Sequence, residues 1–461
     1  MQLQRVEITN REGSRALAVS LAALTGISLT CSIFAPAVMS GDSLYMYRQA
    51  ITGVVEAGKP PMTAFIWMWI LRLWPTPVAL LLFQNVVFWG GLALLVSRCG
   101  FRPIGSALAL LAIGFWPSVF ALLGTLWSDV LLGAVLTLSV GLALSGARRR
   151  SRSALVGSLL LVFIAMSMRF NALPAIMPLV VWLVSLWTRL EWQAAVRPRT
   201  LVAFSILLLL CMLMASIGLS RTIAARDSGG AMRSLQFSLY HDLAGIAVLT
   251  GDLRLPPHVY RSIPNLDLPL IRDAYDAADV NRLVYNPHWS ADGFLTTNPA
   301  EFRELVSTWQ GAIAAHPGAY VRRRLDALAT ILQIDSVYYP FHTGIDANDL
   351  GLRFADGPLY DRVTSWLYAT RGIFFRSWVF AIVAILVLMV GLHRKRWSAV
   401  AVSSSGLLYV APYAVVTTGS DFRYVWWLVL SALLGLLLLG RGGETSSGLQ
   451  TAAVRHDFAT S

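Results

Sequence analysis

Long uninterrupted blocks of apolar residues constrain the fold of this chain more than any other feature. A membrane-spanning helix needs ~20 consecutive apolar residues. Only 13% of the 461 residues are charged, whereas soluble domains carry roughly a quarter. The chain is therefore predicted to be an all-α polytopic membrane protein. About ten blocks qualify as spans, at residues 17–38, 77–97, 103–118, 127–145, 154–168, 172–188, 200–218, 373–392, 398–416 and 425–440.

Basic residues fall in short clusters between these blocks. When the N-terminus is placed in the cytoplasm, the cytoplasmic connections carry the clusters, which is the positive-inside pattern. Both chain ends are therefore predicted to be cytoplasmic, and the net charge of +12 needs no nucleic-acid partner. The run 154–188 could instead be one long span or a re-entrant pair. The clusters are Arg98 with Arg102, residues 148–152, Arg189 with Arg197 and Arg199, residues 393–396, and Arg441.

Two segments on the opposite, outer side are too long to be simple turns. The first, 39–76, carries an apolar stripe at helical spacing (Leu44, Tyr47, Ile51, Val54, Val55) and a Trp-rich run at 62–74. Both features are typical of helices that lie in the membrane interface. The second, 219–372, is polar, contains plausible helices, and is long enough for a small, mainly helical extracytoplasmic domain. The predicted division is a membrane module at 1–218, the outer region at 219–372, C-terminal membrane helices at 373–441 and a disordered cytoplasmic tail at 442–461.

Two acids are predicted at the outer membrane boundary. Asp42 follows the first span, in the stretch SGDSLYMYRQ, and Asp129 lies at the outer end of the fourth. Acids near membrane depth are costly to keep there and are functional candidates. They could share a divalent ion, or one could act as a general base. For Asp42 the ordinary alternative is a helix N-cap, because Gly-Asp-Ser before a helix is a common capping arrangement.

Three cations are predicted at the same level, on the side that should be poor in them. They are Lys59, before Pro60-Pro61, with Arg169 and Arg423. Each alone could be a snorkelling side chain that contacts headgroups. Together they favour an anionic ligand, because Arg offers forked donors and Lys a point charge to phosphate oxygens.

Other motifs contribute less. His241 and Tyr339 lie in the outer region and are kept as acceptor-site candidates, although a lone His is more often structural. Cys31, Cys99 and Cys211 have no metal-ligand spacing and read as small buried residues. The sequence contains no Walker loop, no GxGxxG before a helix, no HExxH and no paired CxxC, which argues against a soluble nucleotide-binding site.

At this point the residues resemble the GT-C superfamily of integral membrane glycosyltransferases. One span, an acid in the first outer loop, interfacial helices and Lys59-Pro-Pro follow one another as in that superfamily, and the DFRY stretch (421–424) resembles its bacterial members. The resemblance implies Asp42 as the catalytic acid, Asp129 as a second acid, and Lys59 at the donor phosphate. The superfamily includes dolichyl-phosphate mannosyltransferases that act on protein and bacterial aminoarabinose transferases that act on lipid A. One departure is that the outer region here precedes the last three spans, whereas several relatives have a C-terminal soluble domain.

The resemblance implies transfer of a sugar from a polyprenyl-phosphate donor to an envelope glycan, a lipid or a surface protein such as a pilin. The enzyme would lie in the bacterial inner membrane with its site facing outward. A divalent cation is compatible with this chemistry and is not required by it. Two alternatives stay open. One is a transporter or flippase of lipid-linked saccharides, which would place polar groups at mid-membrane; the other is a membrane acyltransferase or polysaccharide polymerase that uses His241.

Overall fold

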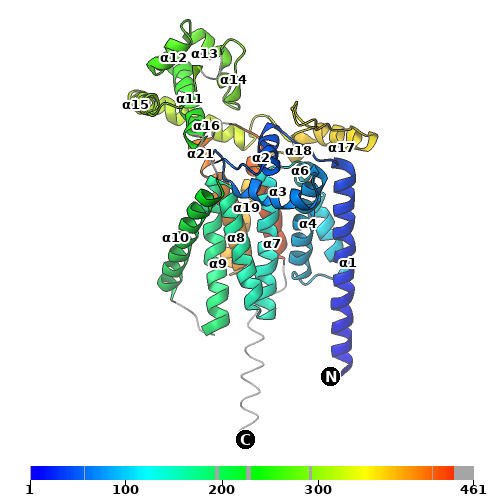
Figure 1. Cartoon of the computed structure of the whole chain (residues 1–461). Helices are drawn as coiled ribbons and strands as arrows, with labels where there is room; N and C mark the ends of the chain where they lie inside the picture. The colour runs from blue at the N-terminus through cyan, green and yellow to red at the C-terminus, as the bar shows by residue number, and fades with distance from the viewer. Residues whose placement is uncertain are drawn as a thin grey trace.

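The structure is a computed structural model that describes residues 2–56, 58–192, 197–224, 230–289, 293–417 and 419–440. Within these residues every regular element is a helix, and β pairing is limited to isolated bridges. Helices form a bundle, from which a group of further helices projects at one end (Figure 1). The predicted all-α polytopic class is confirmed. The predicted tail, 442–461, lies outside the described residues.

Eight helices of the described chain are long and apolar enough to cross a membrane, or up to nine if one bent pair counts as a span. The predicted 103–118 is that pair, α5 (Pro103–Gly114) and α6 (Pro117–Leu123), bent by 69°. Pro117 explains the bend, because proline lacks an N–H and clashes with the preceding turn. The predicted 154–168 is α8 (Arg152–Met168), which at 17 residues is a short apolar helix. The other spans are α1 (Gln2–Phe34), α4 (Pro77–Ser97), α7 (Ser128–Arg149), α9 (Leu173–Trp192), α10 (Pro198–Ile223), α19 (Ser377–His393), α20 (Trp397–Val410) with α21 (Tyr413–Val416), and α22 (Trp426–Leu439).

The run 154–188 forms two helices, α8 and α9, separated by a 3-10 turn (Phe170–Ala172). Helix α8 packs against both α7 and α9. Pro174 accounts for the break, since its ring would clash with the carbonyl of residue 170 in a continuous helix. The backbone of Arg169 is extended at this break, and this conformation places Arg169 at a helix end.

Helix α7 lies at the centre of the bundle, where 83% of its apolar window is buried, against 17% for the peripheral α10. Small residues allow α7 and α4 to approach closely. A Cβ added at Gly91 of α4 would lie 2.7 Å from the backbone of Leu138 on α7. Close approach of this kind stabilises helix pairs in membranes. Because α7 is held on several sides, its first residues have a fixed position at the outer end of the bundle.

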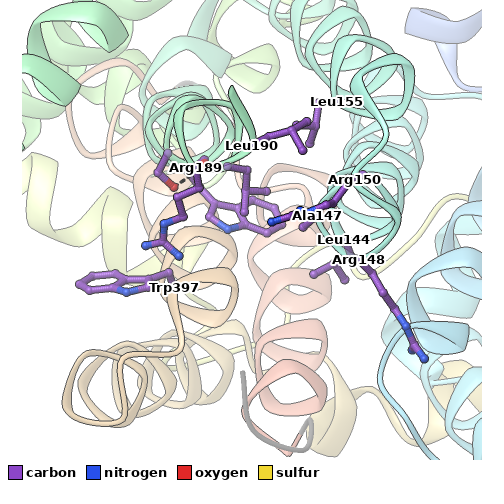
Figure 2. Close-up of a pocket in the computed structure, with 12 residues that line it drawn as sticks. Leu144, Ala147, Arg148, Arg150, Leu155, Arg189, Leu190 and Trp397 are labelled. Carbon is purple, nitrogen blue, oxygen red and sulfur yellow. Dashed lines mark hydrogen bonds between the residues drawn. The ribbon is translucent and has the colours of Figure 1, made fainter. Parts of the chain in front are cut away.

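Basic residues gather at the bundle end opposite to the projecting helices, which we call the basic end. Arg148, Arg150 and Arg189 line one cavity there together with Trp397 (Figure 2). The N-terminus lies at the same end (Figure 1). This arrangement agrees with the positive-inside orientation expected from the sequence.

The outer end carries two sets of helices. Helices α2 (Gly41–Thr52) and α3 (Met62–Leu73) lie against the top of the bundle, as expected for the first outer loop (Figure 1). The predicted stripe is shorter than expected, because α2 stops at Gly53, whose φ of 71° is left-handed. Val54 and Val55 therefore follow the helix, and Ile51 is 48% exposed.

The second set occupies the outer region. Its members are α11 (Gly230–Thr250), α12 (Pro257–Ser262), α13 (Leu268–Ala274), α14 (Asn281–Val284), α15 (Pro299–Ala315) and α16 (Pro317–Ile331), followed by α17 (Pro358–Ala369) and α18 (Arg371–Phe374). Buried side chains from α11 to α15 form a core of their own, whereas Ile331, Phe341 and Leu367 belong to the core of the bundle. Helix α10 continues to Ile223, past the predicted start of this region.

Candidate functional site

A cavity of about 530 Å³ lies where the outer helices meet the bundle. Four of the residues singled out from the sequence line it, and they come from distant parts of the chain: Asp42 from α2, Lys59 from the loop before α3, Arg169 from the α8–α9 break, and Arg423 from the start of the last span. The structure thus brings these four side chains to one cavity wall.

Backbone pairing below α2 fixes the position of Asp42. Val38 pairs with the segment 124–126, and Met39 pairs with 344–346, so three chain segments meet directly before the helix. Asp42 lies in the first turn of α2, and Ser40 is the N-cap residue. The N-cap position is thus held by Ser40 and not by Asp42, and the N-cap alternative for Asp42 is therefore wrong. The Asp42 carboxylate accepts from Lys59. The side chain is free to point into the cavity instead.

The carboxylate of Asp42 lies between two cations. Lys59 Nζ donates to Oδ1, and Arg423 Nη2 lies 2.7 Å from Oδ2. Burial opposes ionisation of Asp42, but the positive charges of Arg423 and Lys59 outweigh it and hold the pKa of Asp42 well below its usual range. About 39% of the side chain is still exposed, so the ionised carboxylate is within reach of a ligand in the cavity.

Arg423 is held on several sides. It forms a second ion pair with Asp421, at 2.8 Å, and its guanidinium lies over the rings of Trp127 (4.8 Å) and Tyr424 (5.0 Å). Its side chain is only 10% exposed. Trp127 is itself fixed, because its indole N–H donates to Ser40 Oγ at 2.8 Å. Charge, stacking and burial therefore all fix the orientation of this guanidinium at the cavity.

Arg169 belongs to a neighbouring cluster. It forms an ion pair with Asp129 at 3.2 Å and donates to the hydroxyl of Tyr413 at 3.1 Å. Tyr409 donates to the other oxygen of Asp129 at 2.7 Å. Asp129 is 1% exposed and is not among the residues that line the cavity, whereas Arg169 lines it and is 23% exposed. These contacts favour a role for Asp129 in positioning Arg169, and its role as a second catalytic acid stays a prediction.

His241 and Tyr339 do not line the cavity. His241 is buried on α11, where Arg323 donates to its Nδ1 at 2.6 Å and its Nε2 hydrogen bonds with the carbonyl of Asp276 at 2.8 Å. Burial and the Arg323 charge lower the pKa of His241 to about 3. Tyr339 hydrogen bonds with His342 and accepts the Phe422 N–H on its carbonyl. Tyr339 thus helps to hold the segment 421–423 in place through its backbone carbonyl. The acceptor-site role of His241 and Tyr339 stays a prediction.

Sequence reasoning missed several members of the site. Asp421 lines the cavity and shares Arg423 with Asp42. Burial raises the pKa of Asp421 above its ordinary value. Its signal was present in DFRY, where an acid directly precedes the last span. A second missed group is the outer wall, which consists of Phe237, Asp279 and Asn281 together with Ser234, Ser238 and Tyr285. These residues come from α11 and from α14 with its flanking residues, and they form no distinctive sequence pattern.

The described residues contain no group of three or more His, Cys, Asp or Glu side chains that could hold a metal ion. Near the cavity the carboxylates of Asp42 and Asp421 are both bound to Arg423. Magnesium is often bound through one or two carboxylates together with substrate phosphates. A divalent cation therefore stays compatible with the site and is not required by it.

Fold and site together define a multi-pass membrane protein with a charge-lined cavity at one end of its bundle, where an acid is surrounded by fixed cations. No family model matches the chain, and no curated protein matches it. A solved structure described as the crystal structure of ArnT from Cupriavidus metallidurans bound to undecaprenyl phosphate is similar, with 14% identity and a TM-score of 0.35. The similarity covers 92% of this chain and 77% of that one. A likeness this distant carries no inference about what the chain does.

Proposed function

We propose that the chain is a membrane glycosyltransferase of the GT-C type. It moves a sugar from a polyprenyl-phosphate donor to an extracytoplasmic acceptor, with inversion at the anomeric carbon. The observation that carries this proposal is the cavity in which Asp42 lies between Lys59 and Arg423, with Arg169 on the same wall. The acceptor is an envelope glycan, a lipid or a surface protein such as a pilin, and the site faces outward from the inner membrane.

The cations support a phosphate-bearing ligand. Arg423 and Arg169 are each held by contacts that leave the guanidinium on the cavity wall. Their rigidity matters, because preorganised donors stabilise a developing negative charge without reorganising during the reaction. Lys59 is 40% exposed and can move between Asp42 and an incoming phosphate. The cavity lies at the outer end of the bundle, where the donor's lipid tail could lie in the membrane beside it.

In the proposed reaction Asp42 accepts the proton of an acceptor hydroxyl. The hydroxyl oxygen forms a bond to the anomeric carbon as the bond from that carbon to the phosphate oxygen breaks, and polyprenyl phosphate leaves from the opposite face. Lys59, Arg169 and Arg423 stabilise the leaving phosphate. When the donor phosphate binds beside Arg423 and Lys59, its negative charge offsets part of the positive charge that depresses the pKa of Asp42, and Asp42 becomes a stronger base. General-base assistance of this kind contributes ~10²–10⁴-fold.

The outer wall suits a sugar ring. Phe237 and Tyr285 lie with ring centroids 6.0 Å apart, and the carboxylate of Asp279 accepts from Asn281 on the same wall. Aromatic faces pack against the C–H faces of a sugar, while carboxylate and amide groups hydrogen bond with its hydroxyls. Asp279 also forms a bridge with Gly419, which couples this wall to the segment that carries Arg423.

The test compares envelope glycans and surface proteins by mass, with and without the gene, and then complements the deletion with Asp42→Asn. We expect loss of the added sugar with normal amounts of folded protein, because an amide cannot take the hydroxyl proton. Asp349→Asn is the matched control. It removes another acid that pairs with an arginine, Arg48, and its side chain is 70% exposed. Full complementation by Asp42→Asn would refute the assignment.

The alternative of a lipid-linked saccharide flippase is separated by a different readout. If the chain is a flippase, the purified protein in vesicles moves a labelled lipid-linked sugar between leaflets without changing its mass. The Asp42→Asn variant then still yields the normal surface glycan when the donor is supplied on the outer side. Under the enzyme proposal the same vesicles release polyprenyl phosphate only when an acceptor is present.

A further inference from the structure

A second cavity lies at the basic end of the bundle, far along the helices from the candidate site. It measures about 350 Å³ and is formed by the end of α7, the turn after it, the start of α8, the second half of α9 and the first residue of α20 (Figure 2). Three arginines line it: Arg148, Arg150 and Arg189. No acidic side chain of the described chain lines it.

The charges of this cavity are only partly compensated. Arg148 pairs with Glu12 at 3.2 Å, and both side chains are exposed. Among the described residues, Arg150 and Arg189 have no ion-pair partner; the nearby Glu191 is bound by Arg152 instead. Arginines at helix C-termini offset the helix dipole, and they also set membrane orientation. Neither effect requires that arginines from different helices surround one cavity.

Apart from Ser185, the remaining side chains that line the cavity are apolar or aromatic. Leu144, Leu155, Leu186 and Leu190 line it together with the indoles of Trp182 and Trp397. Trp397 is 42% exposed at the start of α20. Tryptophan in membrane proteins is enriched at headgroup level, so the position is that of a lipid headgroup rather than of the bilayer centre. An occupant must therefore combine an anionic group with an apolar body.

We infer that this cavity binds an anionic glycerophospholipid, with its phosphate at Arg150 and Arg189 and its glycerol and upper acyl carbons against the leucines. Basic pockets between membrane helices recognise such headgroups. The inference is independent of the proposed enzymatic function, because it uses no residue of the outer cavity.

The site has a structural consequence. The four helices that meet at this cavity carry the Arg169 cluster at their other ends. Helix α7 begins beside Asp129, α8 ends directly before Arg169, α9 follows it, and α20 carries Tyr409 near its end. A lipid that bridges the basic ends of these helices restrains their relative positions. Binding should therefore stabilise the folded bundle, since a ligand that binds only the folded state raises its stability.

The experiment uses the purified full-length protein in neutral detergent, titrated with phosphatidylglycerol or phosphatidylcholine. Retained lipid is measured by native mass spectrometry, and thermal unfolding is followed in parallel. We expect phosphatidylglycerol to bind more tightly and to raise the unfolding temperature. We expect Arg150→Gln/Arg189→Gln to weaken its binding about 10- to 30-fold, given the usual contribution of a basic residue at an anionic lipid surface. The variant Arg150→Lys/Arg189→Lys, which keeps the charge, should retain most of the binding.

The control is Arg102→Gln/Arg394→Gln, which removes the same charge from the same end without touching the cavity. Equal loss in this control would mean general attraction to an anionic surface and would overturn the inference. Equal binding of the two lipids would overturn it too. A third arm adds inorganic phosphate; if phosphate alone displaces the lipid and reproduces the thermal shift, the site is a phosphate site and the lipid assignment is wrong. A cooperative thermal unfolding transition of each variant in phosphatidylcholine shows that the variant was folded at the start.

Discussion

The ion pair between Asp129 and Arg169 gives the most quantitative test of the structure. Asp129 is 1% exposed and lies at the start of the central helix α7. Removing one partner of a buried ion pair typically costs about 3–5 kcal/mol, because the other charge stays buried without compensation. Two features reduce this cost for Asp129→Asn: Arg169 is 23% exposed, and the new amide oxygen can still accept from Tyr409. We expect a loss of about 2–4 kcal/mol.

The assay is reversible unfolding in mixed micelles, arranged as a double-mutant cycle with Arg169→Gln. Because the two side chains contact each other, the cycle should give a coupling free energy of about 1–3 kcal/mol, and the double variant should be more stable than Asp129→Asn alone. Thr137→Val is a matched control, since Thr137 is also buried on α7 but hydrogen bonds only within its own helix, to the carbonyl of Gly133. It should change stability much less.

Variants of the same ion pair distinguish effects on stability from effects on sugar transfer. If Arg169 contacts the donor phosphate, the double variant regains stability but not transfer activity. If Asp129 acts only by holding Arg169, then Asp129→Asn lowers transfer no more than Arg169→Gln does. A change below about 0.5 kcal/mol for Asp129→Asn, which is the range of ordinary surface substitutions, would refute the reasoning that the pair is buried and mutually dependent.

Three further outcomes are expected. Lys59→Met removes one of the cations that depress the pKa of Asp42, so the acidic limb of the pH–rate profile should move to higher pH; an unchanged profile would contradict the base assignment. Because His241 is neutral in the fold, with a pKa of about 3, the unfolded chain takes up a proton below about pH 6.5, and unfolding should become easier there in the wild type but less so in His241→Phe. A Cβ at Gly124 would lie 2.2 Å from the ring of Phe34, so Gly124→Ala should cost about 1–3 kcal/mol in unfolding experiments.

The sequence predicted position along the axis of the helix bundle well. The positive-inside pattern assigns each helix end to the cytoplasmic or the outer side of the membrane. This assignment alone predicted that Asp42, Lys59 and Arg423 lie at the same end of the bundle. The helix count was close for the same reason. The count differs at two places. The break before Pro117 follows from proline chemistry that an apolar-window count does not weigh, and α8 has only 17 residues. The position of a residue along the bundle axis was therefore predictable from composition and charge.

Lateral position was not predictable in the same way. Asp42 and Asp129 share a level, yet one lines the cavity and the other is buried behind it. His241 also lies on the outer side, but α11 packs it into a separate core. Which neighbours a side chain meets at a given depth depends on helix packing, and packing is set by close contacts between residues far apart in the sequence.

The same argument explains why Asp421 escaped notice and why it matters. It lies two positions before Arg423 in the chain. In a helix-forming stretch such a spacing does not suggest an ion pair, because helical neighbours lie three or four residues apart. Here Asp421 precedes the 3-10 turn Phe422–Val425 with a non-helical backbone (φ −58°, ψ 133°), and both side chains line the cavity. Arg423 therefore has a second partner. A ligand phosphate bound beside Arg423 offsets part of its positive charge, and the acid whose ionised form depends most on that charge gains basicity. In the proposed reaction that acid is Asp42, because it also shares Lys59 with the incoming phosphate.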